Sequence, residues 1–333
     1  MAKRRSIQKK SRAPRPGTGS RKIKPPTAEE LNKALAPIRE ARDAREALAV
    51  TVRPTIPPLS PDTVKSVLAS MGLKLGELEK MAATHRKELR ALADERVRAA
   101  AGRSKSLQAF LDRQIAERRK AAQGLSELLP NTRYTVLDRP NGILTTGGLQ
   151  LDHGRIQSYA SWGKVRHQSA SYDPTVRTLV FSYFWQNAIG ADAVITADGY
   201  IVLNGVAQAI DAGGLWLFSH SHTTLTLSVQ LSILDWPVTS QGSEIGYDET
   251  ALYLDAYEDS WPASVGAFLT RNVFRGYDIR LPDIIVKAGQ AKVFEVILRI
   301  ESSVGDGSIS VDFSTGEFQV MSPMLSIAIT SLV

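Results

Sequence analysis

Polar and apolar side chains alternate without a break over residues 224–233, and this pattern constrains the fold more than any other feature of the chain. In an extended strand, one face would carry all of the apolar members, which are Leu225, Leu227, Val229, Leu231 and Ile233. A helix would spread them around its whole surface, so a period of two over this length indicates a β-strand with one buried and one solvated face. The surrounding region is therefore expected to fold around a β-sheet.

After Asn131 the composition changes from Ala, Arg, Leu and Glu to Val, Ile, Thr, Tyr, Gly and Ser. Segment 178–186 is bulky on both faces, which predicts a central strand that is buried on both sides. Segment 193–205 predicts a β-hairpin, because Asp198 and Gly199 tolerate the positive φ angles of a two-residue turn. Further strands are expected at 251–257, 293–301, 308–313, 317–321 and 325–333. About nine to eleven short strands predict an antiparallel, jelly-roll-like β-sandwich, and a barrel of about eight to ten strands is the alternative.

Helical patterns precede this region. Residues 28–50 predict one helix, and Ser60 followed by Pro61 and Asp62 predicts the start of another, with a capping hydroxyl before a proline and an acid. Four prolines within residues 51–61 indicate a stiff connector between them. A heptad seam follows, made of Leu75, Leu78, Ala82, His85, Leu89, Leu92, Arg96 and Ala99. Because a second apolar pattern starts after a short break at 102–104, we expect an antiparallel helical hairpin or coiled-coil stem.

The chain thus divides into a basic arm (1–27), a helix with a proline-rich linker (28–61), a helical stem (62–130) and a β-sandwich head (131–333). The net charge of +7 is unevenly distributed over these parts. Residues 1–24 contain ten of the 41 Lys and Arg residues and no acid, whereas residues 131–333 contain 12 basic and 20 acidic residues. A positive arm is therefore joined to a negative head.

The arm is rich in Lys, Arg, Pro, Gly and Ser, and it lacks the apolar content that would offset the entropy of ordering it. We therefore expect a disordered segment that attracts polyanions, with nucleic acid as the first candidate partner and an anionic membrane surface as the second. The candidate polyanion-binding residues are Lys3, Arg4, Arg5, Lys9, Lys10, Arg12, Arg15, Arg21, Lys22 and Lys24. A solubilising tail or an export signal is the alternative interpretation of the arm.

Aromatic residues are frequent in the head. Those in predicted strands are expected in the core, whereas those in long loops could form a platform for a glycan or protein ligand, because such side chains anchor many interfaces. The candidate platform residues are Trp162, Tyr172, Trp216 and Trp261.

His220 and His222 are the one histidine pair with a spacing that suits a shared metal, with Asp211 or Glu244 as a third ligand. We favour the simpler interpretation that this pair is a polar entry to a strand. We therefore expect no metal site and no cofactor.

Several classes of protein are not indicated. The chain has no cysteine, so disulfides and thiolate chemistry are excluded. No phosphate-cradling loop and no Ser-centred nucleophile elbow is present. No apolar run follows the basic N-terminus as in a secretory signal, and no stretch is long enough for a transmembrane helix, so the sequence leaves the compartment open.

These observations predict a non-enzymatic structural or binding protein. Its sandwich head would serve recognition or assembly, its helical stem self-association, and its arm the binding of nucleic acid or another polyanion. The layout of a basic arm followed by a sandwich resembles that of many icosahedral capsid proteins. The chain departs from that layout because about 70 helical residues lie between its arm and its sandwich. An exported effector or toxin and a metal-dependent hydrolase that uses His220 and His222 are the alternatives.

Overall fold

The computed structural model describes residues 22–49, 60–128, 132–170, 174–211, 220–238, 245–259, 267–305 and 307–332. Its helices are α1 (Ala28–Ala49), α2 (Pro61–Ser70) and α3 (Leu75–Leu128). Its strands are β1 (Thr132–Leu137), β2 (Gly142–Thr146), β3 (Gln150–Arg155), β4 (Trp162–Ser169), β5 (Thr175–Gln186), β6 (Ala193–Asp211), β7 (His220–Trp236), β8 (Ile245–Asp259), β9 (Phe268–Val286), β10 (Ala291–Ser303), β11 (Gly307–Phe313) and β12 (Gln319–Ser331).

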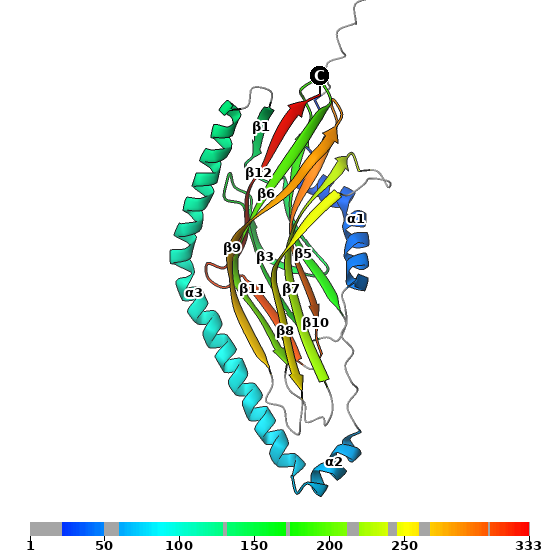
Figure 1. Ribbon diagram of the computed structural model, residues 1–333, viewed down its shortest axis with the longest axis vertical. Coiled ribbons are helices and arrows are strands. Elements are labelled where there is room, and N and C mark those ends of the chain that lie inside the picture. The colour runs from blue at the N-terminus through cyan, green and yellow to red at the C-terminus, as the bar shows by residue number, and fades with distance from the viewer. Residues whose placement is uncertain are drawn as a thin grey trace, which may run out of the picture.

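The strands form two antiparallel sheets packed face to face (Figure 1). The seven-stranded sheet has the order β1-β12-β4-β11-β6-β9, with β3 paired to β4 and with β12 also paired to β6. The five-stranded sheet has the order β2-β5-β10-β7-β8. Neighbouring strands in either sheet are mostly distant in the chain, because the chain repeatedly crosses between the two sheets. The predicted β-sandwich is confirmed.

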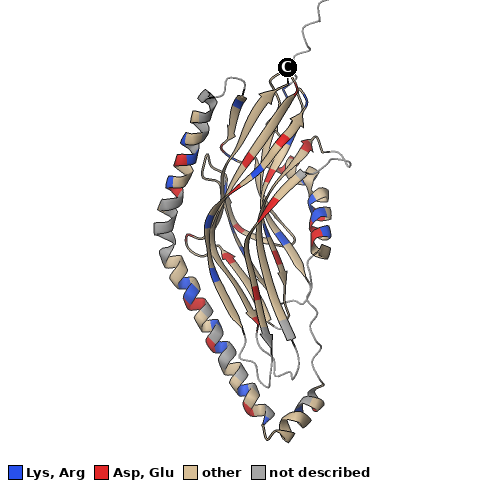
Figure 2. Ribbon diagram, viewed as in Figure 1, with Lys and Arg blue, Asp and Glu red and all other residues tan. Residues whose placement is uncertain are grey.

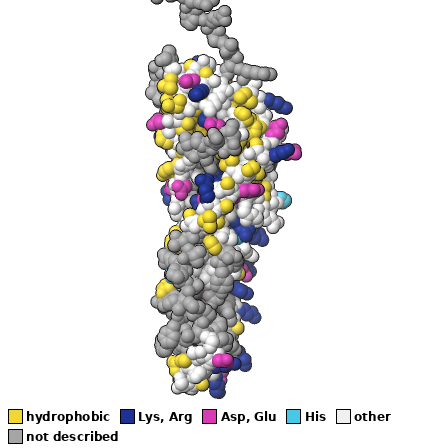
Figure 3. Space-filling view, turned by 90° about the vertical axis from the view of Figure 1, so that its right-hand side faces the viewer, with side chains coloured by type: hydrophobic (Ala, Val, Ile, Leu, Met, Phe, Trp, Pro, Cys, Tyr) yellow, Lys and Arg dark blue, Asp and Glu magenta, His cyan; other side chains and the backbone are white. Residues whose placement is uncertain are grey.

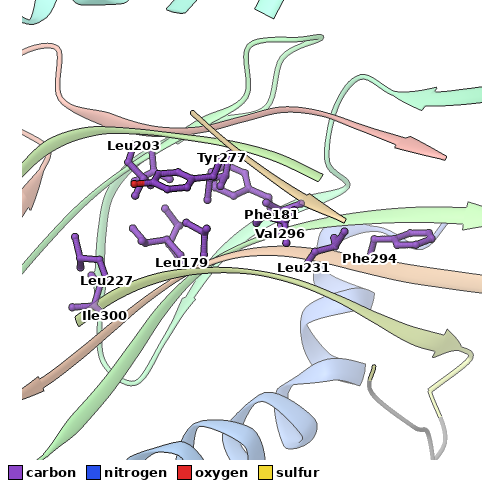
Figure 4. Packing of buried hydrophobic residues seen from close by; sticks show 14 of the residues in the cluster. Leu179, Phe181, Leu203, Leu227, Leu231, Tyr277, Phe294, Val296 and Ile300 are labelled. Atoms are coloured by element: carbon purple, nitrogen blue, oxygen red, sulfur yellow. The ribbon is translucent and has the colours of Figure 1, made fainter. Parts of the chain in front are cut away.

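Alternating residues of both sheets fill the space between them. The inward side chains of β7 are at most 2% exposed, as their period of two predicts. They meet side chains from β5, β6, β9 and β10, among them Phe181, Leu203, Tyr277 and Phe294, which converge in one cluster (Figure 4). Strand β5 lies between β2 and β10 and is buried from Thr178 to Trp185, so the expectation of a strand buried on both faces is also correct.

The predicted hairpin at 193–205 is wrong, because β6 runs through Asp198 and Gly199 as one strand of 19 residues. Gly199 instead faces the opposite sheet. A Cβ atom at this position would lie 3.2 Å from a methyl carbon of Val296 and 3.3 Å from one of Leu231. The glycine therefore marks a close approach of the two sheets, which a sequence reader cannot distinguish from a turn.

Helix α1 covers part of the outer face of the five-stranded sheet (Figure 1). Leu31 and Leu35 are fully buried against Phe184, Leu234 and Val293. The outward residues of β5 and β10 are apolar here because a helix, and not water, covers them. Although the sequence groups this helix with the linker, it packs as part of the head.

Helix α3 contradicts the predicted hairpin, because it is one continuous helix of 54 residues. Gly102 lies in its interior, where a single glycine costs only about 1 kcal/mol relative to alanine and no proline adds to that cost. Val97 and Ile115 both contact the seven-stranded sheet. They are 18 residues apart, which is five helical turns, so only an unbroken helix presents both to the same surface.

The outer face of the seven-stranded sheet supports α3 along part of its length (Figure 1). Ile115 packs against Tyr200, Val202 and Met321, and Ala100 packs against Val206 and Phe318. The helices carry many of the charged side chains, in both signs, while most strand residues are uncharged (Figure 2). Within the described residues, no helix is both long and apolar enough to cross a membrane.

Candidate functional site

The first described residues, 22–24, form the root of the basic arm, and this root is attached to the head. The backbone N–H of Ile23 donates a hydrogen bond of 2.9 Å to Oε1 of Gln186, and the Ile23 side chain packs against the α1 cluster. Lys22 and Lys24 on either side of Ile23 are exposed. At the other end of the chain, the N–H of Leu332 donates to the carbonyl oxygen of Asp192 in the turn after β5. The arm therefore begins at the end of the head where the chain also ends.

Thr27 and Glu30 form a reciprocal cap that starts α1 directly after this root. The backbone N–H of Thr27 donates to Glu30 Oε2 at 2.7 Å, and the N–H of Glu30 donates to Thr27 Oγ1 at 3.2 Å. These bonds hold the pKa of Glu30 below its usual value. The remaining candidate polyanion-binding residues lie outside the described residues, and they are Lys3, Arg4, Arg5, Lys9, Lys10, Arg12, Arg15 and Arg21.

Trp162, the described member of the candidate aromatic platform, lies on β4 beneath α3. It packs against the cluster around Ile115, with the Lys164 amine 5.9 Å from its ring centroid. This tryptophan therefore contributes to the contact between helix and sheet. Tyr172, Trp216 and Trp261 lie outside the described residues.

Two other aromatic residues are exposed on the outer face of the five-stranded sheet. Tyr253 and Tyr257 of β8 are 51% and 42% exposed, although strand aromatics were expected in the core. Leu252 and Leu254, which alternate with them, point into the core between the two sheets. The alternation in this stretch, read as in 224–233, would have predicted the exposure of these tyrosines.

A polar cluster surrounds these rings. The His222 ring stacks on Tyr257 with centroids 4.3 Å apart, and its Nδ1 lies 3.0 Å from Oδ1 of Asp255. The hydroxyl of Tyr253 donates to the other carboxylate oxygen of Asp255 at 3.4 Å. This cluster, which we call the tyrosine face, is formed by Tyr253, Asp255 and Tyr257 of β8 and His222 of β7. It offers planar aromatic surface beside hydrogen-bonding groups.

The described residues do not bring the candidate metal ligands together. His222 is engaged by Asp255, and Asp211 is fully buried on β6 in the opposite sheet. Glu244 and the side chain of His220 are not described. Among the described residues, no three His, Cys, Asp or Glu side chains are grouped closely enough to hold a metal ion.

Buried charges hold α1 on the sheet. The guanidinium of Arg39 donates through Nε to Oε1 of Glu295 at 2.8 Å and through Nη2 to Ser182 Oγ at 3.1 Å. Arg42 Nη1 lies 3.3 Å from the second carboxylate oxygen of Glu295. The Glu295 side chain is fully buried, and those of Arg39 and Arg42 are 2% and 4% exposed. Beside them, burial raises the pKa of Asp43, even though Thr146 donates a hydrogen bond to its carboxylate. This network of buried ion pairs and hydrogen bonds attaches α1 to the five-stranded sheet.

No family model and no curated protein matches this chain. Three solved structures illustrate what it is similar to in fold. TmCBM61 in complex with beta-1,4-galactotriose is 11% identical, with a TM-score of 0.18 over 59% of this chain and 93% of that chain. The enzymatically active domain of tailspike protein 4 of Bacteriophage CBA120 is 10% identical, with a TM-score of 0.21 over 59% and 19%. The structure of infectious bursal disease virus, Gx strain, is 10% identical, with a TM-score of 0.19 over 60% of this chain and 37% of that chain. Superpositions this poor carry no argument about function.

Proposed function

We propose that this chain is a non-enzymatic binding and assembly protein, in which a rigid β-sandwich presents a basic arm that binds nucleic acid. The observation that carries the proposal is the attachment of the arm. Eight of the ten Lys and Arg residues of the arm precede the root, and the other two flank Ile23, which Gln186 and the α1 cluster hold on the head. The attachment point of the arm therefore lies on the head, at the same end as Leu332.

The strand order supports the assembly part of the proposal. With β11 and β12 together taken as the last strand between β4 and β6, the order β4-β11/β12-β6-β9 opposite β5-β10-β7-β8 matches that of two interleaved Greek keys, as in a jelly roll. Leu92 and Met81 on α3 are 41% and 68% exposed and offer the stem a surface for self-association. A jelly roll alone does not specify a function, so the arm carries the proposal.

The test is a fluorescence anisotropy titration of a labelled oligonucleotide at several salt concentrations. Full-length protein should bind without sequence preference, because the arm has no aromatic residue to stack on bases. Deleting residues 1–27, which removes all ten basic residues of the arm, should abolish binding, because the head carries a net charge of −8. Replacing Lys3, Arg4, Arg5, Lys9 and Lys10 by Gln should flatten the plot of log affinity against log salt by roughly 0.9 per lost phosphate contact on duplex DNA. Equal affinity of the full-length and truncated proteins would exclude the arm and leave its export-signal interpretation.

A second candidate function is recognition of a saccharide by the tyrosine face. The exposure of Tyr253 and Tyr257 favours it, because aromatic rings stack on the apolar faces of sugars while neighbouring carboxylates accept hydrogen bonds from their hydroxyl groups. Binding to immobilised neutral glycans should be lost in Tyr253→Ala together with Tyr257→Ala and retained in Tyr134→Ala, a tyrosine on β1 of the other sheet. Retained glycan binding by the β8 double variant would reject this candidate.

A further inference from the structure

A polar cleft of about 710 Å³ lies between α3 and the outer face of the seven-stranded sheet, away from the tyrosine face and from the root of the arm. Helix α3 forms one wall and strands β4, β6 and β11 form the other. The wall residues are Arg90, Asp94, Val97, Arg98, Arg166, Gln168, Ser169, Ala170, Gln208, Ile210, Ser308, Ile309, Ser310, Asp312 and Thr315. We call this space the α3 cleft.

The cleft exists because the contact between helix and sheet changes from apolar to polar. Val97 packs on Val206 and Phe318, but Asp94 and Arg90, which lie on the same helical face one and two turns earlier, are exposed. The sheet changes in step, since Gln208 follows Val206 on the same face of β6. Two polar surfaces gain little from burial against each other, so the helix and the sheet leave a space that water or a polar molecule can fill.

The floor of the cleft is an ordered row of hydrogen-bonding side chains. Gln168 on β4, Ser310 on β11 and Gln208 on β6 are direct neighbours across three adjacent strands. Arg166, Asp312 and Val206 form the next row. Because the strands fix these positions, the amide and hydroxyl groups are presented in a set geometry before any ligand arrives.

The cleft carries more positive charge than negative charge that is not already engaged in other contacts. Asp312 is already engaged, because its Oδ1 accepts bonds of 2.8 and 2.9 Å from the N–H groups of Ser314 and Thr315, and its Oδ2 accepts the Thr315 hydroxyl. Arg166 lies against the same carboxylate at 3.8 Å. Within the described residues, Arg90 forms no ion pair, and Arg98 donates only to the backbone carbonyl of Asp94. Asp94, which lies between Arg90 and Arg98 on the same helix, is the other acid of the cleft, so two guanidinium groups and one carboxylate face the floor.

We propose that the α3 cleft binds a small polyhydroxylated molecule that carries an oxyanion, such as a sugar acid or a sugar phosphate. Guanidinium forks match the planar geometry of carboxylate and the tetrahedral oxygens of phosphate, and the row of Gln and Ser side chains suits vicinal hydroxyl groups. Among the described residues, no aromatic side chain lines the cleft, so this part of it offers no stacking surface for a nucleobase. The cleft is thus a site distinct from the nucleic-acid-binding arm.

The experiment is isothermal titration of the full-length chain with glucuronate, glucose 6-phosphate, inorganic phosphate and glucose at physiological salt. Both sugar anions should bind more tightly than glucose, and the stronger of the two identifies the oxyanion. Arg90→Gln with Arg98→Gln should weaken binding at least tenfold. The matched control is Arg4→Gln with Arg5→Gln, which removes the same charge from the arm and should leave the affinity unchanged.

A second variant separates recognition of the hydroxyl groups from attraction to charge. Gln168→Ala with Ser310→Ala keeps every charge, so it should weaken the sugar anions at least threefold and leave inorganic phosphate unaffected. Circular dichroism spectra would establish that each variant is folded. Absence of binding by both sugar anions at millimolar concentration, equal affinity for glucose, or equal losses in the cleft and arm variants would each overturn the proposal.

Discussion

Replacing Glu295 by alanine should be among the most destabilising single substitutions in this protein. Its carboxylate is fully buried and forms ion pairs with the guanidinium groups of Arg39 and Arg42 at the contact between α1 and the five-stranded sheet. Removing it leaves Arg39 buried without a counter-charge and leaves Arg42 with Asp43, at 3.7 Å, and breaking a buried ion pair in this way typically costs about 3–5 kcal/mol. At about 1.4 kcal/mol per factor of ten, the equilibrium constant for unfolding should rise by about two to three and a half orders of magnitude.

The assay is urea unfolding at neutral pH, followed by tryptophan fluorescence and circular dichroism. With an m-value of about 3 kcal/mol per molar, the midpoint should fall by roughly 1–1.7 M. The control Glu77→Ala removes an ion pair between Glu77, in the first turn of α3, and Lys74, just before that helix. The two side chains are 70% and 79% exposed, so this change should cost at most about 1 kcal/mol. Glu295→Leu with Arg39→Met should recover part of the loss, because an apolar pair does not need a counter-charge. If Glu295→Ala cost no more than Glu77→Ala, the proposed fastening of α1 would be refuted.

Three further predictions concern individual sites. Burial lowers the pKa of His167 to about 4, so the stability that its neutral form provides should be complete above pH 6.5 and lost as the pH falls toward 4; unfolding curves across this range should show a shallower pH dependence for His167→Gln. Burial raises the pKa of Asp43, so ionisation opposes folding, and Asp43→Asn should gain stability relative to the parent as the pH rises from 4 to 7; a gap that is constant with pH would contradict this. A Cβ atom at Gly276 would lie 2.1 Å from the Tyr200 hydroxyl, so Gly276→Ala should displace the Tyr200 ring from Arg118. This variant should destabilise the fold by about 1–3 kcal/mol and increase hydrogen exchange in α3. The control Gly102→Ala, where a Cβ atom would have no neighbour within 4 Å, should stabilise the protein by up to about 1 kcal/mol.

The candidate sites were only partly visible in the sequence. The basic arm is evident from composition, because ten like charges in 24 residues need no partner to be recognised. The tyrosine face was hidden because an aromatic residue in a strand has two faces to choose from, and only the sheet reveals which one is inside. The α3 cleft could not be predicted, since Arg90 and Gln168 are 78 positions apart and meet only when α3 lies on the sheet.

The sequence by itself determined the local elements whose signals are periodic or conformational. The alternation of residues 224–233 determined β7 and its buried face, and Ser60 determined the start of α2, where its hydroxyl accepts the N–H of Thr63. These signals depend on neighbours in the chain, so no long-range contact is needed to read them.

Tertiary structure decided everything that depends on which surface covers which. It made α3 one helix through Gly102, because Val97 and Ile115 gain burial on the same sheet face, and it made β6 one strand through Gly199, because the opposite sheet leaves no room there for a side chain. Glycine permits either a turn or a continuous element, and the free energy of packing, which comes from residues distant in the chain, selects between them.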